Sequence, residues 1–121
     1  MPKGDKDLTF MNGVPELLIL QLLDRREMYG YELVEAIHVE SHEALSFGEG
    51  CVYPILHSLE RKGMLKSRRM EKDGRSRVYY AVTPAGKSRL RETIDHWATL
   101  SAAINGILGK GARHARPSTA G

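Results

Sequence analysis

The chain has 121 residues, 41% of them hydrophobic, and its 18 lysines and arginines against 15 aspartates and glutamates give a net charge of +3. This length predicts one domain with a modest core and excludes a chain that is disordered throughout. No uncharged apolar run reaches 18 residues and the first ten residues lack the apolar segment of a signal peptide, so we expect a cytoplasmic protein with no membrane contact.

Both ends of the chain are predicted to lack regular structure. Residues 1–12 are polar and contain glycine, and residues 109–121 combine glycine, serine, proline and arginine without periodicity. We therefore expect a flexible N-terminal arm over 1–12, a compact domain over 13–83, a long helix over 84–108 and a disordered tail over 109–121.

Two helices are predicted to follow the N-terminal arm. The run VPELLILQLLDRR, which begins at Val14, places Pro15 in the first turn, where a missing N–H costs little, and Glu16 at the positive end of the helix dipole. Apolar residues cover most of its circumference, so we expect burial on more than one side. The run YGYELVEAIHVES has helical apolar spacing and predicts a second, amphipathic helix after a short link.

A third helix is predicted within SFGEGCVYPILHSLERKGML, residues 46–65. Ser46 and Glu49 have the spacing of a capping box, and Gly63 occupies the place of a left-handed residue that ends a helix. The apolar stripe consists of Val52, Leu56 and Leu59, and the opposite face carries Tyr53, His57, Ser58 and Arg61.

Pro54 lies inside this third helix and has two interpretations. If the helix begins at Phe47, the proline removes the hydrogen bond to the Gly50 carbonyl and bends the helix. If the regular helix begins only near Val52, Pro54 falls in the first turn at almost no cost. Both interpretations place the Tyr-Pro pair at the entry end of the helix.

A β-hairpin is predicted next, because two extended runs flank KDGRS with Asp-Gly at its centre. Its second strand alternates between a core face and a basic outer face; the core face has Val78, Tyr80 and Val82, and the outer face Arg77, Tyr79 and Ala81. Residues 61–77 hold eight basic and two acidic residues, a net charge of +6, whereas the rest of the chain has −3. Such a block favours a nucleic acid as partner, although a merely solvated basic hairpin is the alternative.

Acidic residues gather in a different part of the chain. Residues 24–49 carry seven acidic residues and only two arginines. An acidic second helix is not expected to lie close to phosphates, so any contacts with nucleic acid should concentrate on the third helix and the hairpin.

Thr83 and Pro84 are favourable N-cap and first residues for a last helix, which is predicted to end near Leu108 after about 25 residues or ~38 Å. Its apolar residues follow the 4-3-4-3-4 spacing of a coiled coil, with Ser101 at one position. Because the chain offers no second long helix, we expect a symmetric homodimer, the alternative being a helix that folds back on its own domain. The predicted dimer interface consists of Leu90, Ile94, Trp97, Ile104 and Leu108.

The predicted fold is mainly α with a small β-hairpin, a winged helix-turn-helix plus one long C-terminal helix. In such a fold the third helix enters the major groove and the hairpin reaches the adjacent backbone. We therefore predict double-stranded DNA as partner. The predicted DNA contacts are Tyr53, His57, Ser58, Arg61, Lys72, Arg75 and Arg77.

Three stretches resemble the PadR-like transcriptional regulators: GYELVEAI, GCVYPILHSLERKGML and GRSRVYYAVTPAG. The family pattern there is roughly G-Y-E-L, then G-T-L-Y-P-x-L-x-x-L-E-x-x-G-L, then R-x-Y-Y-x-L-T-x-x-G. The resemblance covers residues 14–108 in the same order and spacing. It departs at Cys51 and Val52, where Thr-Leu is usual, and at Met64, where Leu or Ile is usual.

The resemblance implies a dimeric repressor that binds an inverted-repeat operator and releases it in response to a small molecule or another signal. The single C-terminal helix is similar to the short branch of the family, in which flat compounds stack on an aromatic residue of that helix. Trp97 occupies the matching position, so the implied site for a small aromatic effector consists of Leu17, Gln21 and Trp97. The alternative is that Trp97 is only a residue of the dimer core.

Other chemistries are less well supported. His38 and His42 have a metal-chelating spacing but no third ligand, so we expect no metal or cofactor. Cys51, near a helix N-terminus, is either a redox-active thiol with a lowered pKa or a small packing residue. No catalytic set is evident, and we expect no enzyme. The alternative to a DNA-binding regulator is a winged-helix adaptor that binds proteins and not DNA.

Overall fold

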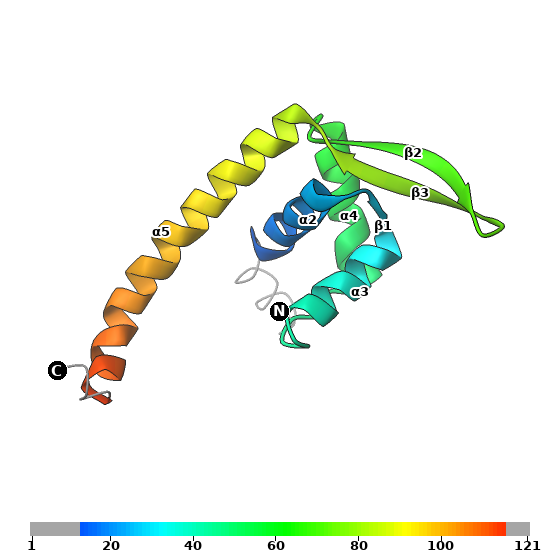
Figure 1. The fold of residues 1–121 in the computed structure, drawn as a ribbon. Coiled ribbons are helices and arrows are strands. Elements are labelled where there is room, and N and C mark those ends of the chain that lie inside the picture. Colours follow the sequence, from blue (N-terminus) through cyan, green and yellow to red (C-terminus); the bar gives the residue numbers. More distant parts are fainter. Residues whose placement is uncertain (1–12, 116–121) are drawn as a thin grey trace, which may run out of the picture. The chain divides into compact units, whose positions relative to one another are not determined.

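The computed structural model describes residues 13–115, with side chains as far as residue 109. The described residues form four helices and one three-stranded sheet (Figure 1). In chain order these are α2 (Gly13–Arg25), β1 (Met28–Tyr29), α3 (Gly30–Glu40), α4 (Glu49–Arg61), β2 (Leu65–Lys72), β3 (Arg75–Val82) and α5 (Pro84–Ala115). The predicted winged helix-turn-helix followed by a long helix is thereby confirmed, while the predicted arm over 1–12 lies outside the described residues.

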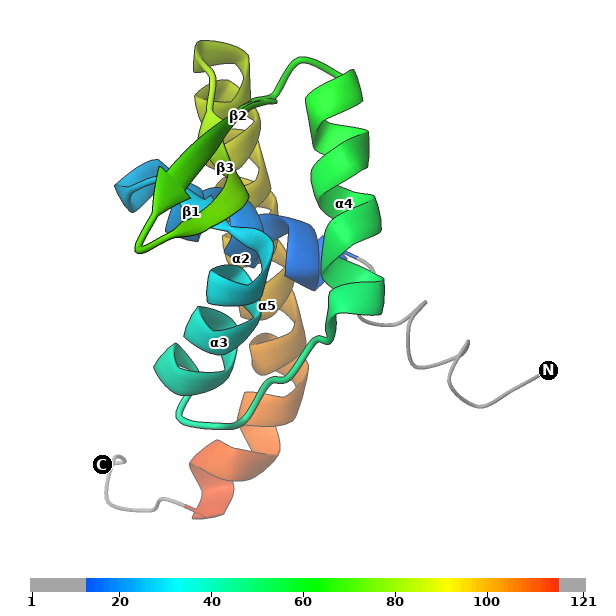
Figure 2. The ribbon, with the colours of Figure 1, turned by 90° about the vertical axis from the view of Figure 1, so that its right-hand side faces the viewer.

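The chain divides into two compact units, the first ending at Leu90 and the second beginning at Arg91. In the first unit α2 contacts α3, α4 and β3 and so lies at the centre of the core (Figure 2). Ile19, Leu33 and Leu56, one from each of the three helices, are fully buried. Burial of such side chains stabilises the unit by about 1.5–3 kcal/mol each and fixes the positions of α3 and α4.

The beginning of α4 differs from the predicted capping box. The helix begins at Glu49 with Gly48 as its extended N-cap, and Ser46 is exposed. Phe47 explains the shift, because its side chain is buried in the same core cluster as Val52. An apolar residue before the N-cap that packs with the fourth helical residue is a hydrophobic staple, and here it takes the place of a side-chain cap. The helix ends as predicted, with Gly63 in the left-handed region at φ 78°.

The helix begins at Glu49, between the two predicted starts, and Pro54 is its sixth residue, inside the helix as the first interpretation expected. Its missing N–H leaves the carbonyl of Gly50 without the usual partner four residues later. Gly50 is exposed, so water can take the place of that donor.

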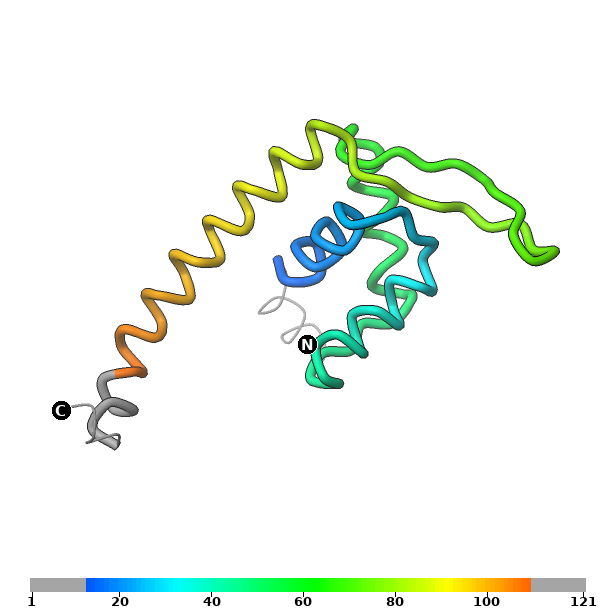
Figure 3. The backbone as a smooth tube through the Cα atoms, in the orientation of Figure 1, coloured from blue at the N-terminus to red at the C-terminus, as the bar shows by residue number. Residues whose placement is uncertain are grey.

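The sheet contains one strand more than predicted. The short strand β1 pairs antiparallel with β3, Tyr29 opposite Tyr79, which gives the order β1-β3-β2. The hairpin itself turns at Asp73 and Gly74, both with positive φ, as expected for a two-residue Asp-Gly turn. Figure 3 shows β2 and β3 as a long two-stranded arm, which we call the wing.

Tyr79 does not lie on an exposed outer face as the alternation predicted. It is only 5% exposed, because the ring of Tyr29 meets it edge to face with 5.3 Å between the ring centroids. The extra strand β1 therefore covers the part of the wing nearest the helices.

Residues 84–90 attach the first turns of α5 to the first unit. The hydroxyl of Thr83 accepts the N–H of Gly86 at 3.1 Å, as predicted for an N-cap, and donates to the carbonyl of Gly63 at 2.7 Å. Lys87 pairs with Asp24, and Leu90 is 4% exposed within the core. Leu90 therefore belongs to the core of the first unit, which corrects its predicted place in a dimer interface.

The second unit consists of the remainder of α5. The helix continues to Ala115 and passes the predicted end at residue 108, while residues 116–121 of the predicted tail lie outside the described residues. Large apolar side chains are exposed along it: Ile94, Trp97, Leu100, Ile104, Ile107 and Leu108. Within the described part of the chain, no helix has the length and apolar character that crossing a membrane requires.

Candidate nucleic-acid interface

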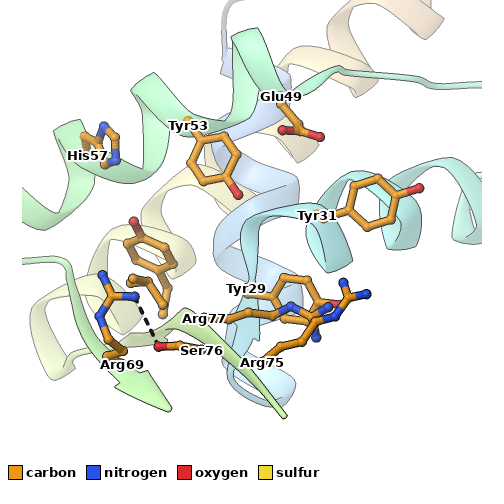
Figure 4. A pocket seen from close by; sticks show the side chains of 11 residues that line it. Tyr29, Tyr31, Glu49, Tyr53, His57, Arg69, Arg75, Ser76 and Arg77 are labelled. Atoms are coloured by element: carbon orange, nitrogen blue, oxygen red, sulfur yellow. Dashed lines mark hydrogen bonds between the residues drawn. The ribbon is translucent and has the colours of Figure 1, made fainter. Parts of the chain in front are cut away.

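A cleft of about 760 Å³ separates α4 from the wing. Figure 4 shows Glu49, Tyr53 and His57 along the α4 side and Arg69, Arg75, Ser76 and Arg77 along the wing side. Tyr29 and Tyr31, from β1 and the start of α3, complete the lining together with Val78 and Tyr80. One side of the cleft is thus a helix face and the other carries three arginines.

Tyr53, one of the predicted contact residues, lies close to the beginning of α3. Its ring is half-buried and rests on the backbone of Gly30, so closely that a Cβ atom at position 30 would overlap it. Burial and, to a lesser degree, the nearby Glu49 carboxylate raise the pKa of the Tyr53 hydroxyl. The hydroxyl therefore stays protonated at neutral pH and can donate a hydrogen bond into the cleft.

The other predicted α4 residues follow Tyr53 along the helix. His57 is exposed, with its ring centroid 6.1 Å from that of Tyr53, and it lines the cleft. Ser58 is half-buried, and Arg61 is exposed as the last residue of the helix. Neither Ser58 nor Arg61 lines the cleft.

The basic residues of the wing lie mostly near its tip. Lys72 ends β2 and Arg75 begins β3, and both are exposed. Arg77 is half-buried because its guanidinium carbon lies 4.3 Å from the centroid of the Tyr29 ring. Arg69 donates to the hydroxyl of Ser76 at 3.3 Å.

The ion pairs of the first unit involve other basic residues than those at the tip of the wing. Four of the seven acids in residues 24–49 have a basic partner: Asp24 with Lys87, Glu27 with Arg68, Glu32 with Arg26, and Glu40 with Arg25. Among the described residues, none of Arg69, Lys72, Arg75 and Arg77 forms an ion pair. Four of the seven acids are thus paired with basic residues at the protein surface, and Glu49 lies in the cleft lining beside the arginines. The wing residues Arg69, Lys72, Arg75 and Arg77 keep their positive charge for an external anion.

The cleft brings together four of the seven predicted DNA contacts: Tyr53, His57, Arg75 and Arg77. Ser58, Arg61 and Lys72 lie outside it. Sequence reasoning missed Tyr29, Tyr31 and Arg69 as lining residues. Arg69 belongs to the basic block and Tyr31 to the GYEL stretch, so both signals were present in the sequence, whereas nothing local pointed to Tyr29.

The rival chemistries find no support in the described residues. The helix α3 ends at Glu40, and His42 lies beyond it with φ 56°, so the helical spacing with His38 is lost. No group of three metal-ligating side chains is found within residues 13–109. Burial raises the pKa of the Cys51 thiol, in contrast to the lowered pKa that a redox-active thiol needs.

The residues of the predicted effector site belong to both units. Leu17 and Gln21 lie on α2 of the first unit, and both are half-buried. Trp97 lies on α5 in the second unit and is 46% exposed.

Known proteins of similar sequence and structure are transcriptional regulators. A curated relative, the transcriptional regulator Rv3488 of Mycobacterium tuberculosis, is 35% identical over 83 residues, which cover 69% of this chain and 75% of the relative. A transcriptional regulator from Clostridium thermocellum has a similar structure, with a TM-score of 0.75 at 28% identity over 81% of this chain and 96% of the other.

A PadR family transcription regulator from Clostridium difficile R20291 is similar as well, with a TM-score of 0.67 at 29% identity over 78% of this chain and 97% of the other. Residues 19–92 match the family described as "Transcriptional regulator PadR-like family". These matches are to regulators and not to enzymes, as the sequence predicted. The chain therefore belongs to the PadR-like family of transcriptional regulators.

Proposed function

We propose that this protein binds specific double-stranded DNA with α4 and the wing, and that it regulates transcription as a homodimer. The observation that supports the proposal best is the cleft, in which the polar face of α4 lies opposite arginines that form no ion pair with any described residue. The major groove, about 12 Å wide, admits one helix, and the wing then lies against the neighbouring phosphate backbone. Phosphate contacts supply most of the affinity, and base contacts from α4 supply the specificity.

The proposed homodimer is supported by the exposed apolar side chains of α5. Ile94, Trp97, Ile104 and Leu108 keep the predicted coiled-coil spacing, and Leu100 and Ile107 widen the stripe. A second copy of the helix would cover them and relate two α4 helices by a two-fold axis, which matches an inverted-repeat operator with half-sites about 34 Å apart. A dimer seated on such an operator acts as a repressor by occupying the promoter.

An aromatic effector is proposed to act through Trp97. Its exposed ring offers a surface on which a planar compound can stack. The measurement is tryptophan fluorescence, which only this residue contributes. Saturable quenching by a planar dye, together with release of bound DNA, would support the effector site, and a broad panel of planar compounds without quenching would contradict it.

The DNA-binding proposal is tested with two arginines of the wing. Arg75→Ala removes an arginine that lines the cleft and has no ion pair within the described part of the chain, whereas the matched control Arg68→Ala removes one that Glu27 already pairs at 3.0 Å. We expect Arg75→Ala to weaken binding to a duplex selected by the wild-type protein from random DNA about tenfold. Arg68→Ala should weaken it about twofold or less. Equal affinities for wild type and Arg75→Ala would contradict the assigned surface.

A further inference from the structure

We infer that the dipeptide Tyr29-Gly30 positions the recognition helix and the wing relative to each other, an inference that rests on the proposed DNA-binding function. Arg77 of the wing stacks on the ring of Tyr29, and Tyr53 of α4 rests on the backbone of Gly30. Of these two neighbouring residues, Tyr29 thus contacts the wing side of the cleft and Gly30 contacts the α4 side. Neither of them is itself a predicted DNA contact.

The stack on Tyr29 orients Arg77 without using its hydrogen-bond donors. A guanidinium that lies over an aromatic face in a cation–π contact uses none of its N–H groups as hydrogen-bond donors in that contact. With the guanidinium carbon 4.3 Å from the ring centroid, these donors remain available to a phosphate in the cleft. We therefore assign Tyr29 as a positioning residue for Arg77.

Gly30 acts by lacking a side chain. The ring of Tyr53 occupies the space in which a Cβ atom would lie, and the atoms that would be overlapped are at the far end of the Tyr53 side chain. A Cβ at position 30 would therefore push the end of the Tyr53 ring away from its place. The glycine sets how deeply Tyr53 sits in the cleft.

Several contacts fix the backbone of the dipeptide. Tyr29 pairs with Tyr79 in the sheet, and its N–H donates to the Glu32 carboxylate at 3.2 Å at the start of α3. The dipeptide is therefore held by the sheet on one side and by α3 on the other. Because the two contacts are adjacent along the chain, a shift of this backbone moves Arg77 and Tyr53 together.

The role of Tyr29 is tested with Tyr29→Leu and the matched control Tyr29→Phe. Binding to the wild-type-selected duplex should weaken about fivefold in Tyr29→Leu, because leucine has no ring for the cation–π interaction, and change less than twofold in Tyr29→Phe, which keeps the ring. In an Arg77→Ala background, Tyr29→Leu should weaken binding no further. A full fivefold weakening in that background, or equal affinities for Tyr29→Leu and wild type, would overturn the assignment.

The role of Gly30 is tested in the same assay with Gly30→Ala. Its matched control is Gly13→Ala, which also changes the first residue of a helix but adds a Cβ to open space. Gly30→Ala should weaken binding about fivefold with little change in the thermal unfolding midpoint, and in a Tyr53→Ala background it should have no effect. Weaker binding that persists without Tyr53 would show that Gly30 acts through another neighbour and would contradict the inference.

Failure of this inference differs from failure of the proposed function. If the wild-type protein selects no duplex and binds none at low salt, the proposed function is wrong and the inference with it. If the wild type binds but the variants at positions 29 and 30 bind equally well, only the positioning role is refuted. A reduced dependence of affinity on salt in Tyr29→Leu, but not in Tyr29→Phe, would show that Arg77 no longer neutralises a phosphate.

Discussion

Two glycines of α5 differ in the space around their Cα atoms. A Cβ on Gly86 would collide with the backbone carbonyl of Met64 and approach Cγ1 of Val82 to 2.8 Å, whereas a Cβ on Gly106 meets nothing within 4 Å. A backbone carbonyl cannot move aside as a flexible side chain can. The beginning of α5 and the beginning of β2 therefore require glycine at position 86.

Gly86→Ala should lower the free energy of unfolding by about 2 kcal/mol, because overpacking against backbone is costly. Gly106→Ala should raise the free energy of unfolding by about 0.5–1 kcal/mol, since alanine favours a helix where space is open. Urea denaturation of both variants measures the two values. A Gly86→Ala variant as stable as the wild type would contradict the close contact between Gly86 and the Met64 carbonyl.

Cys51 offers a second test at a single residue. Burial raises its pKa, so the reactive thiolate is scarcer at a given pH than in a free cysteine. At pH 8.5 we expect iodoacetamide to alkylate Cys51 more slowly than it alkylates glutathione, with the rate still rising at higher pH. Faster alkylation than glutathione at neutral pH would instead indicate an activated thiol.

The tyrosines mark the limit of what alternation along a strand can predict. Tyr80 was correctly placed on the core face, since period-two alternation shows which residues share a face. Alternation cannot show what covers the other face, and Tyr79 is buried there by Tyr29, which lies 50 residues earlier in the chain. Because this contact is long-range, the sequence near Tyr29 did not indicate that Tyr29 belongs to the candidate site.

At the scale of elements, Thr83 connects three of them. Thr83 directly follows the last residue of β3. Its hydroxyl caps α5 and also donates a hydrogen bond to the carbonyl of Gly63, just after the end of α4. Thr83→Ala removes both hydrogen bonds and should lower the free energy of unfolding by about 2 kcal/mol. Thr99→Ala, at an exposed position within the same helix, should change it by about 0.5 kcal/mol or less. Thermal or urea unfolding measures the free energy of unfolding of both variants. Equal stabilities of Thr83→Ala and Thr99→Ala would contradict the linking role of Thr83.

Helix existence was predictable and helix ends were less so. The apolar spacing of α2, α3, α4 and the first part of α5 is a local property, and each of these helices was found. The start of α4 depends on the burial of Phe47 in a core that other helices build. Ser46 was a plausible N-cap from the local sequence, but burial of Phe47 places the N-cap at Gly48 instead. The continuation of α5 to Ala115 was missed because residues 109–121 combine glycine, serine, proline and arginine without an apolar periodicity.

At the scale of the whole molecule, the exposed stripe of α5 predicts association. Ile104→Glu places a charge in the centre of the stripe and should give a monomer in sedimentation equilibrium at concentrations where the wild type has twice the chain mass. Ala102→Glu adds the same charge at an exposed position nearly opposite on the helix and should leave the mass unchanged. A wild type that is monomeric at all accessible concentrations would contradict the homodimer.

DNA binding by the wing and α4 is the central claim, and the salt dependence of duplex affinity tests it most directly. The cleft arginines, which form no ion pair with any residue that the structure describes, should release counterions from the DNA backbone. The logarithm of the binding constant should therefore fall linearly and steeply with the logarithm of salt concentration. Arg75→Ala should reduce the slope by about one for each phosphate that this arginine neutralises in the wild type. Affinity that does not change with salt, or no binding to duplex DNA at low salt, would contradict the claim and favour a protein-binding adaptor.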